Sequence, residues 1–464
     1  MTSPRSSSQI ARTFMVVVTM MIAAGSTTAA WGAPGDEGWT RRYDRAGLED
    51  AGFEVVTSSD GTRLYVGGWA STPETGNDFL TVAYDAATGE RLWKKHFTGT
   101  REGRDTILGI ALSPDDALLF VTGTSEAPNG QTHIRTIAYE AASGLVRWSQ
   151  KFRDVVGNPR GIAASPDGSA VFVTGSSIGA DGRIQMVTIA YQAATGLQEW
   201  VARYDGAGNR TDFGVALAVG PSSRRVFVTG IRAGGPDQTD YVTIAYRTSD
   251  GSAVWTRIYD GPASGPDDPS ALALSSDGAR VFVTGRSKAE THDYATVAYD
   301  AGSGATLWVR RYDGMAQLDE SFDVASTGNT VFVTGRSVGS STSYDVATIA
   351  YEASTGQRLW GDRYDGPDGG FDGGTALATS PDGGTIFVAG GVTAGGASDF
   401  LTIAYAADSG RNLWDAQYDG PAGVIDYALD VATDPLGSRI FVTGTSWTGA
   451  TSMTGDVATI SYET

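Results

Sequence analysis

Residues 83–93 read Ala-Tyr-Asp-Ala-Ala-Thr-Gly-Glu-Arg-Leu-Trp, and versions of this stretch recur along the chain. In each version a Gly-centred turn precedes a tryptophan, in the pattern Thr-Gly-x-x-x-Trp. These tryptophans are Trp93, Trp148, Trp200, Trp255, Trp308, Trp360 and Trp414. An eighth, Trp39, stands near the start of the chain, where we identify no such turn before it. Internal repetition is therefore the first property of this sequence to interpret.

A tyrosine shortly before each turn marks eight repeat units. It falls at Tyr84, Tyr139, Tyr191, Tyr246, Tyr299, Tyr351, Tyr405 and Tyr462, at intervals of 52 to 57 residues. In the fifth unit, short β-branched and aromatic runs cover residues 271–274, 281–284, 294–299 and 307–312, as strands would. The runs are nearly continuous in hydrophobicity, so neighbours should cover both faces of each small sheet. Four strands repeated radially predict the blades of an all-β propeller.

The two ends of the array are incomplete in complementary ways. The eighth unit stops at residues 461–464, inside its third strand, and lacks a tryptophan strand. Residues 39–44 read as a fourth strand without a third strand before it. Pairing them removes the exposed edges of an open array. We therefore predict an eight-bladed β-propeller of four-stranded antiparallel blades, closed by an N-terminal strand that completes the last blade. An open β-solenoid is the alternative.

Residues 83–93 resemble the tryptophan-docking motif Ala-x-Asp-x-x-Thr-Gly-x-x-x-Trp of the eight-bladed propellers in the pyrroloquinoline-quinone-dehydrogenase-like superfamily. The resemblance extends over all eight units and implies that each indole, Trp39 included, lies against a neighbouring blade and is structural. The motif's Asp is replaced by Glu140, Gln192, Arg247 and Ala406, and its Thr by Ser143, Ser303 and Ser409. The resemblance says little about activity, because one propeller fold carries unrelated functions.

Residues 1–30 have the pattern of a secretory signal peptide. Arg5 and Arg12 accompany an apolar core at residues 13–24, and small residues at 28–30 suit cleavage. The core is shorter than the roughly 20 residues of a membrane-spanning helix, and an uncleaved anchor is the alternative. The chain has no cysteine, which excludes disulfides and lipid attachment through a thiol. We expect residues 31–37 to form a linker, residues 38–464 a single propeller, and the product to be a secreted monomer without a membrane span.

The charge of the chain is strongly acidic. It has 34 basic and 53 acidic residues, for a net charge of −19. Residues 1–30 contain two of the basic residues and none of the acidic ones, so the remainder is more acidic still. Such a surface repels nucleic acid and favours cationic partners or metal ions.

The loops indicate which rim of the propeller carries function. The first–second and third–fourth turns of each unit share one rim and are short and uniform. The second–third loops and the links between units share the other rim and vary, as at residues 124–131, 231–240 and 366–373. Variable loops on a repeated scaffold are where function usually lies. We therefore place candidate binding residues on this variable rim.

One repeated aspartate should enter the innermost strand of most units, at the mouth of the central channel. It falls at Asp50, Asp105, Asp212, Asp267, Asp372 and Asp426, with Asp319 one step off and Gly157 in the third unit. Such a ring of aspartates could bind Ca²⁺ or a cationic ligand through carboxylate oxygens. Alternatively, each Asp caps backbone N–H groups or pairs with an arginine of the outer strand, such as Arg203 or Arg363. The near-eightfold repetition favours the structural alternative.

Two tryptophans outside the docking motif form a second candidate site. Trp69 and Trp447 open second–third loops of the first and eighth units, which closure makes neighbours. Paired indoles could stack on a sugar ring or an aromatic ligand, or they could cover the seam where the chain ends meet. Arg232, Arg286 and Arg336 occupy comparable places in units four to six, as anion ligands or as solvated side chains.

The chemistry of the sequence favours a secreted, non-catalytic binding or scaffolding propeller, while catalysis stays open. The resemblance implies a quinone-dependent dehydrogenase, with the quinone under a vicinal disulfide and a Cys-linked haem. A chain without cysteine can form neither the disulfide nor the haem link, which places this alternative last. His96, His133 and His292 lie in different units, and carboxylate pairs such as Glu320 with Asp323 or Asp267 with Asp268 are common in acidic chains. A hydrolase or lyase using rim carboxylates is the alternative. No cofactor is predicted, Ca²⁺ is an option, and an extracellular protein or glycan is the expected partner. Assembly-factor relatives in the superfamily bind proteins, which supports this class.

Overall fold

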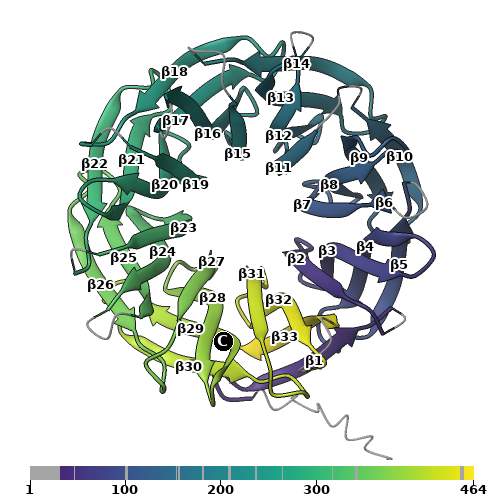
Figure 1. Ribbon diagram of the computed structural model, residues 1–464, viewed down its shortest axis with the longest axis vertical. Coiled ribbons are helices and arrows are strands. Elements are labelled where there is room, and N and C mark those ends of the chain that lie inside the picture. Colours follow the sequence, from purple (N-terminus) through teal and green to yellow (C-terminus); the bar gives the residue numbers. More distant parts are fainter. Residues whose placement is uncertain are drawn as a thin grey trace, which may run out of the picture. The chain divides into compact units, whose positions relative to one another are not determined.

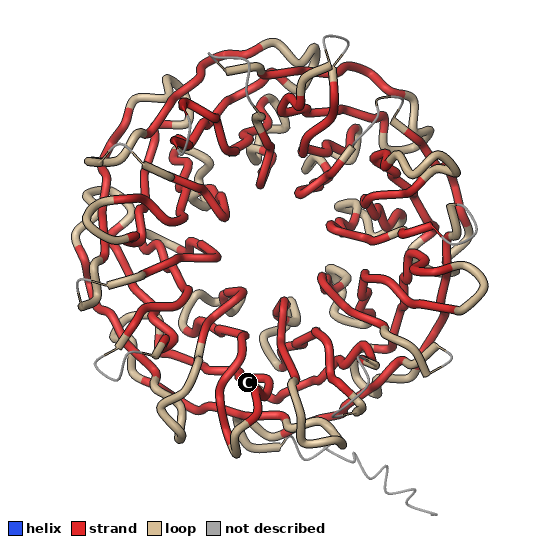
Figure 2. The backbone as a smooth tube through the Cα atoms, viewed as in Figure 1, coloured by secondary structure: helices blue, strands red, loops and turns tan. Residues whose placement is uncertain are grey.

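The computed structural model describes residues 32–45, 47–99, 103–152, 154, 157–179, 182–206, 211–235, 238–263, 265–315, 317–339, 343–449 and 454–464. All regular structure in these segments is β-strand (Figure 2). They contain no helix long and apolar enough to cross a membrane. The expected signal peptide, residues 1–30, lies outside the described residues.

Eight antiparallel sheets are arranged around a ring (Figure 1). The innermost strands are β2 (Asp50–Thr57), β7 (Thr106–Leu112), β11 (Asn158–Ala164), β15 (Phe213–Val219), β19 (Asp267–Leu274), β23 (Asp319–Thr327), β27 (Gly373–Thr379) and β31 (Asp426–Thr433). The second strands are β3 (Arg63–Thr72), β8 (Leu118–Glu126), β12 (Ala170–Ile178), β16 (Arg225–Gly235), β20 (Arg280–Lys288), β24 (Thr330–Val338), β28 (Thr385–Ala394) and β32 (Arg439–Trp447). Blades are numbered 1 to 8 from β2.

The third and fourth strands complete each blade. The third strands are β4 (Gly76–Asp85), β9 (Thr132–Glu140), β13 (Ile184–Gln192), β17 (Gln238–Arg247), β21 (His292–Asp300), β25 (Tyr344–Glu352), β29 (Ala397–Ala406) and β33 (Gly455–Glu463). The outer strands are β5 (Arg91–Phe97), β10 (Val146–Lys151), β14 (Gln198–Tyr204), β18 (Ala253–Tyr259), β22 (Thr306–Tyr312), β26 (Arg358–Tyr364), β30 (Asn412–Tyr418) and β1 (Glu37–Tyr43). Blade 1 has one addition, the short strand β6 (Gly103–Arg104), which pairs in parallel with β4.

The chain ends close the ring, as the sequence predicts. Strand β1 pairs antiparallel with β33, with Trp39 opposite Ser461 and Tyr43 opposite Val457. The eighth sheet therefore has the order β1-β33-β32-β31. Trp39 packs between Phe441 of blade 8 and Tyr84 of blade 1, with ring centroids 5.8 and 6.1 Å away. The eight-bladed closed propeller is confirmed.

One expectation about this closure is wrong. We identified no turn before Trp39, but Gly35 stands four residues before it, the same spacing as Gly89 before Trp93. Gly35 has a positive φ of 88°, and its amide donates to the Glu463 carbonyl at 2.9 Å. A Cβ at Gly35 would lie 3.1 Å from Trp414 Cδ2. The N-terminal segment therefore supplies the docking turn of blade 8 as well as its outer strand.

Each blade interface has its own apolar core, organised around a docked indole. Trp308 lies 5.9 Å from Phe282 of its own blade and 6.0 Å from Tyr351 of the next, measured between ring centroids. Its Nε1 donates to the Ala353 carbonyl at 3.0 Å. The next blade's Gly356 has a φ of 69°, and a Cβ there would lie 2.6 Å from Trp308 Cδ2. The Gly and the Trp of the motif are therefore required together, because the indole lies on the bare backbone of the turn.

Candidate functional site

The two rims are built as the loop pattern predicts. On one rim, the first–second turn of blade 4 meets its third–fourth turn, where the Thr248 hydroxyl donates to the Ser223 carbonyl at 2.6 Å. On the variable rim, Asp212 joins a blade link to the end of the second strand, β16. Its carboxylate accepts from the Gly206 amide at 2.5 Å and from the Ala233 amide at 3.0 Å.

The same arrangement holds the other repeated aspartates. All are buried, with 0–1% of their surface exposed. Their carboxylates accept one amide from the preceding link and one from the end of the second strand of the same blade: Arg45 and Ser71 for Asp50, Gly99 and Glu126 for Asp105, Gly261 and Lys288 for Asp267, Gly366 and Thr393 for Asp372, and Gly420 and Trp447 for Asp426. Burial raises the pKa of Asp50 to about 7. These contacts correspond to the structural alternative, in which each Asp caps backbone amides.

The arginines of the outer strands bind other aspartates. Arg363 pairs with Asp345 at 2.7 Å, and Arg311 pairs with Asp293 at 2.8 Å. Arg203 pairs with Asp154. The expected pairing of Arg203 and Arg363 with the repeated aspartates is therefore not what the structure contains. The arginines reach carboxylates of third strands and of a blade link instead.

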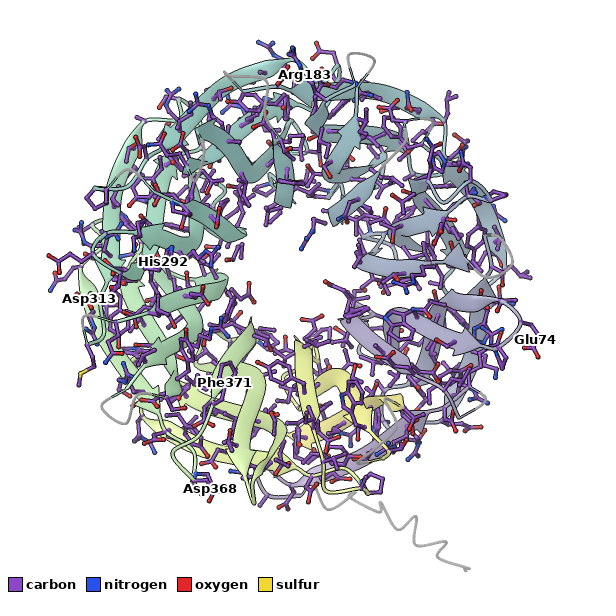
Figure 3. The ribbon with its side chains drawn as sticks, viewed as in Figure 1. Glu74, Arg183, His292, Asp313, Asp368 and Phe371 are labelled. Carbon is purple, nitrogen blue, oxygen red and sulfur yellow. The ribbon has the colours of Figure 1, made fainter. Side chains whose placement is uncertain are left out.

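In three places among the described residues, three aspartates offer carboxylate oxygens that all lie within 4.8 Å of one another. They are Asp240 with Asp260 and Asp267, Asp293 with Asp313 and Asp319, and Asp399 with Asp419 and Asp426. In each triad two aspartates are buried and one is exposed; the exposed Asp313 lies at the periphery of the ring (Figure 3). Hard cations take several carboxylate oxygens, so such triads could hold metal ions. Each triad joins the third strand of one blade to the inner strand of the next.

The two rim tryptophans differ in exposure. Trp69 is buried, with 9% of its surface exposed, and it lies opposite Phe79 in the β3–β4 ladder. Trp447 is partly exposed, and its amide donates to Asp426 at 3.1 Å. Among the described residues no ring contact joins the two indoles. They therefore do not form a paired stacking platform in this conformation.

The rim arginines of blades 4 to 6 are all paired with carboxylates. Arg232 contacts Asp240 at 2.6 Å. Arg286 contacts Asp268 at 2.7 Å and Glu320 at 2.8 Å. Glu320 also binds Arg336. Burial alone would raise the pKa of Glu320, but hydrogen bonds from the two arginines lower it overall.

Arg336 also stacks within an aromatic cluster. Its guanidinium carbon lies 4.6 Å from the ring centroid of Tyr344 and 5.3 Å from those of Phe322 and Phe371. Phe371 lies just before the start of β27 (Figure 3). A guanidinium that is stacked and also donates two hydrogen bonds to one carboxylate oxygen is a rigid surface feature.

An amphipathic groove runs across the inner ends of blades 3 to 6. A cavity of about 450 Å³ is lined by Arg160, Phe213, Val215, Ile231, Ser270 and Phe322. A second cavity of about 290 Å³ shares Ile231, Ser270 and Phe322 with it and adds Asp268, Arg286 and Glu320. We call the two together the inner groove. It combines an apolar floor, including the 37% exposed Phe213, with fixed charges, which is the composition of a binding site.

The inner groove is lined by residues that the sequence pattern did not single out. Each inner strand skips one residue in its pairing with the second strand, as between Ser321 and Asp323. The skipped residues in blades 3 to 6 are Arg160, Val215, Ser270 and Phe322, and all four line the inner groove. A bulge re-aims a side chain. The sequence signal for these groove residues is their position, three residues after each repeated aspartate, where the residue type varies from unit to unit.

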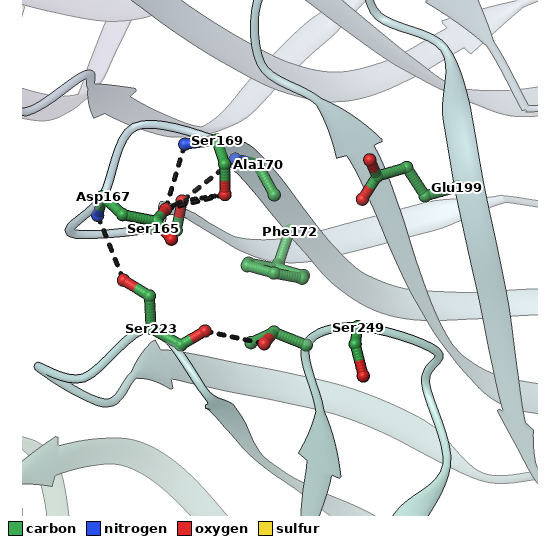
Figure 4. A pocket seen from close by; sticks show the side chains of 9 residues that line it. Ser165, Asp167, Ser169, Ala170, Phe172, Glu199, Ser223 and Ser249 are labelled. Carbon is green, nitrogen blue, oxygen red and sulfur yellow. Dashed lines mark hydrogen bonds between the residues drawn. The ribbon is translucent and has the colours of Figure 1, made fainter.

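The uniform rim carries a different pocket. A polar cavity of about 340 Å³ lies between blades 3 and 4 (Figure 4). Asp167 accepts from the Ser165 hydroxyl at 2.6 Å and from the Ser169 amide at 3.0 Å. Its own amide donates to the Ser223 hydroxyl at 3.0 Å. These are turn-forming contacts of a kind that recurs in other units.

The candidate catalytic groups are not brought together. His96 binds the Tyr43 hydroxyl at 2.9 Å, and burial together with Arg45 lowers its pKa to about 4. His133 contacts the Asp154 carbonyl, and His292 lies in blade 5 (Figure 3). Glu320 and Asp323 also diverge, because Asp323 accepts the Leu377 amide of the next blade at 2.8 Å. Asp267 and Asp268 likewise have different partners.

These features define the class of protein: an eight-bladed β-propeller with docked tryptophans and a groove at the inner rim. Matches to the family described as outer membrane protein assembly factor BamB cover residues 77–218, 132–367 and 189–425, more than half of the chain. The chain therefore belongs to this family of PQQ-like repeat propellers. No match to a curated protein was found.

Solved structures show the same fold at low sequence identity. BamB from Moraxella catarrhalis is 15% identical, with a TM-score of 0.50, 92% of this chain and 100% of that chain covered. A quinohemoprotein alcohol dehydrogenase from Pseudomonas putida is 14% identical, with a TM-score of 0.56 and coverage of 92% and 76%. Sqt1 from Chaetomium thermophilum, bound to the N-terminus of a ribosomal protein, is 12% identical, with a TM-score of 0.60 and coverage of 92% and 100%.

The inner-strand carboxylates predict a dependence of stability on pH. Burial raises the pKa of Asp323 to about 6 and that of Asp430 to about 7, above the unfolded value of about 3.9. The folded state therefore binds protons more tightly, and stability should rise as pH falls from 8 towards 5 and level off near 4. Below pH 4, carboxylates with a lowered pKa, such as Asp60 at about 2, act in the opposite direction.

Thermal melting between pH 8 and pH 4 measures this effect. Asp430→Asn keeps an oxygen for the Val55 amide, which Asp430 accepts at 2.7 Å, but removes the titration. The variant should show a smaller rise in melting temperature than the wild type. A wild-type melting temperature that is constant or falls from pH 8 to pH 5 would contradict the prediction.

Proposed function

We propose that this protein is an exported, non-catalytic propeller that binds a segment of an extracellular protein in the inner groove. The observation that carries the proposal is the groove itself, where Phe213, Ile231 and Phe322 offer apolar surface beside the Arg286–Glu320–Arg336 network. An apolar floor with a few fixed polar groups suits a peptide side chain and its backbone. The buried Trp69 offers little surface for a glycan, which favours a protein ligand.

Charge suggests the composition of the bound segment. The net charge of −19 attracts cationic partners over long range. Exposed aspartates at the ends of outer strands, at Asp44, Asp205, Asp260, Asp365 and Asp419, lie on the variable rim. The expected ligand is therefore an aromatic or aliphatic residue flanked by Lys or Arg. The family is described as an assembly factor, and Sqt1 is bound to the N-terminus of a ribosomal protein. Both descriptions support a protein as the ligand.

Peptide binding can be tested without a known partner. A random peptide library is panned on the protein of residues 31–464, and an enriched peptide is titrated by fluorescence anisotropy. Phe322→Ala should weaken binding at least about tenfold, since buried aromatic anchors usually dominate interface energy. Leu197→Ala is the control, because Leu197 is 65% exposed on the uniform rim.

The melting temperatures of both variants should match that of the wild type, so that a loss of peptide binding is not caused by unfolding. Loss of binding in Phe322→Ala but not in Leu197→Ala supports the inner groove. Equal binding by wild type and Phe322→Ala, or no enriched peptide at all, contradicts the proposal.

Export is a separate part of the proposal, supported by the residue 1–30 pattern. The Ala33 amide binds Asp36 at 2.6 Å and Gly35 packs on Trp414. Cleavage should therefore fall before residue 33, which N-terminal sequencing of protein from the culture medium tests.

A further inference from the structure

The triad of Asp399, Asp419 and Asp426 differs from the other two because no arginine among the described residues pairs with its third-strand aspartate, Asp399. Asp240 is paired with Arg232 at 2.6 Å, and Asp293 is paired with Arg311 at 2.8 Å. At the position of Arg311, blade 7 has Gln417, and at the position of Arg232 it has Val392. The arginine that pairs with the third-strand aspartate of the other two triads is therefore absent from both positions in blade 7, and the positive charge near this triad is that of Arg42, which lowers the pKa of Asp426.

The side chain of Asp399 is buried without compensation. Only 6% of its surface is exposed, and its Oδ1 is buried with no hydrogen-bond partner among the described residues. Gln417 does not replace the arginine, because its amide nitrogen points to the Tyr364 hydroxyl at 3.4 Å. Burial and the neighbouring Asp419 and Asp426 raise the pKa of Asp399 to about 6. An unpaired buried carboxylate costs free energy unless a charge partner is supplied.

The rest of the triad is oriented towards the same point. Asp426 is held by the amides of Gly420 at 2.6 Å and Trp447 at 3.1 Å, and a carboxylate retains further lone pairs beyond those two bonds. Asp419 is the exposed member, so it leaves one side open to water. Arg42 does not fill the gap, since its guanidinium binds Asp456 and Ser446.

We propose that Asp399, Asp419 and Asp426 bind a single divalent cation, with Ca²⁺ preferred, at the junction of blades 7 and 8. Two oxygens bound to one Ca²⁺ at about 2.4 Å can be at most about 4.8 Å apart, and the three carboxylates meet that limit. An all-oxygen set with open positions for water suits Ca²⁺ and excludes soft metals. The ion supplies the charge that an arginine supplies in blades 4 and 5, and it ties β29 to β31.

Isothermal titration calorimetry on chelator-treated protein of residues 31–464 tests the site. CaCl₂ should show one saturable site with a Kd of about 10⁻⁴–10⁻³ M, the range of extracellular modules, and MgCl₂ should bind more weakly. Asp399→Asn should weaken Ca²⁺ binding at least about tenfold. The matched control is Asp240→Asn, the same position in the arginine-paired triad of blade 4, which should bind Ca²⁺ as the wild type does.

A second variant guards against simple misfolding. Gln417→Arg installs the residue found at this position in blade 5, so the protein should fold and its guanidinium should displace Ca²⁺. Ca²⁺ should raise the melting temperature of the wild type but not of Gln417→Arg. The proposal is overturned if the wild type binds no Ca²⁺, if both blade 7 variants bind it normally, or if Asp240→Asn loses as much affinity as Asp399→Asn.

Discussion

A chain that lacks residues 31–44 is expected to lose its monomeric, cooperatively folding state. The deletion removes β1, so β33 loses its partner strand and presents an open edge. It also removes Trp39, which packs between Phe441 and Tyr84. Trp414 in turn loses Gly35, the glycine against which it packs. Unpaired strand edges and exposed apolar surface promote association between chains. Size-exclusion chromatography and differential scanning calorimetry should show oligomers and a broadened transition at lower temperature.

Relocating the same residues provides the control. Residues 32–44, joined by a flexible linker after Thr464, can still pair with β33 and should restore a monomer. A truncated chain that stays monomeric and melts like the full protein would show that the ring does not depend on this closure.

Trp308→Ala should destabilise the propeller by about 3–5 kcal/mol, the usual cost of truncating a large buried aromatic side chain. Trp308 is 5% exposed and fills the interface between blades 5 and 6. Its loss leaves a cavity beside Phe282 and Tyr351 and frees the Ala353 carbonyl. Urea denaturation of the wild type and the variant, followed by fluorescence of the remaining tryptophans, measures the difference.

The adjacent Leu307 makes a matched control for this variant. It lies on the same strand but is 44% exposed, so Leu307→Ala should change stability by no more than about 0.5 kcal/mol. If the two variants are equally stable, the docked indole is not the element that holds neighbouring blades together.

Much of the ring follows from local sequence. The motif around Trp93 specifies a turn, an outer strand and an indole that needs a bare glycine to pack against. Because every unit repeats that requirement, blade number and closure could be predicted from the positions of eight tryptophans and eight tyrosines. The turn at Gly35 could also be predicted, because the spacing from Gly35 to Trp39 equals the spacing from Gly89 to Trp93. It was missed because the motif's Thr is absent there.

The candidate sites were less predictable, because they depend on which groups meet across blades. The repeated aspartates could be placed at the inner rim, but their amide partners come from a blade link and from the end of a second strand, which are separated in the sequence. The inner groove depends on bulges that turn Ser270 and Phe322 out of the strand pairing, and periodicity alone does not report a bulge.

The architecture follows from the repeated motif, because each unit carries both the tryptophan and the glycine turn on which a neighbouring tryptophan docks, and eight such units close a ring. Which carboxylates have a charge partner follows only from the folded blades. Arg311 and Gln417 occupy the same position in the repeat, yet only the folded blades show that one balances a triad and the other leaves Asp399 without a partner. Charge balance in a buried site is set by atoms a few ångströms apart in space, and those atoms come from different blades.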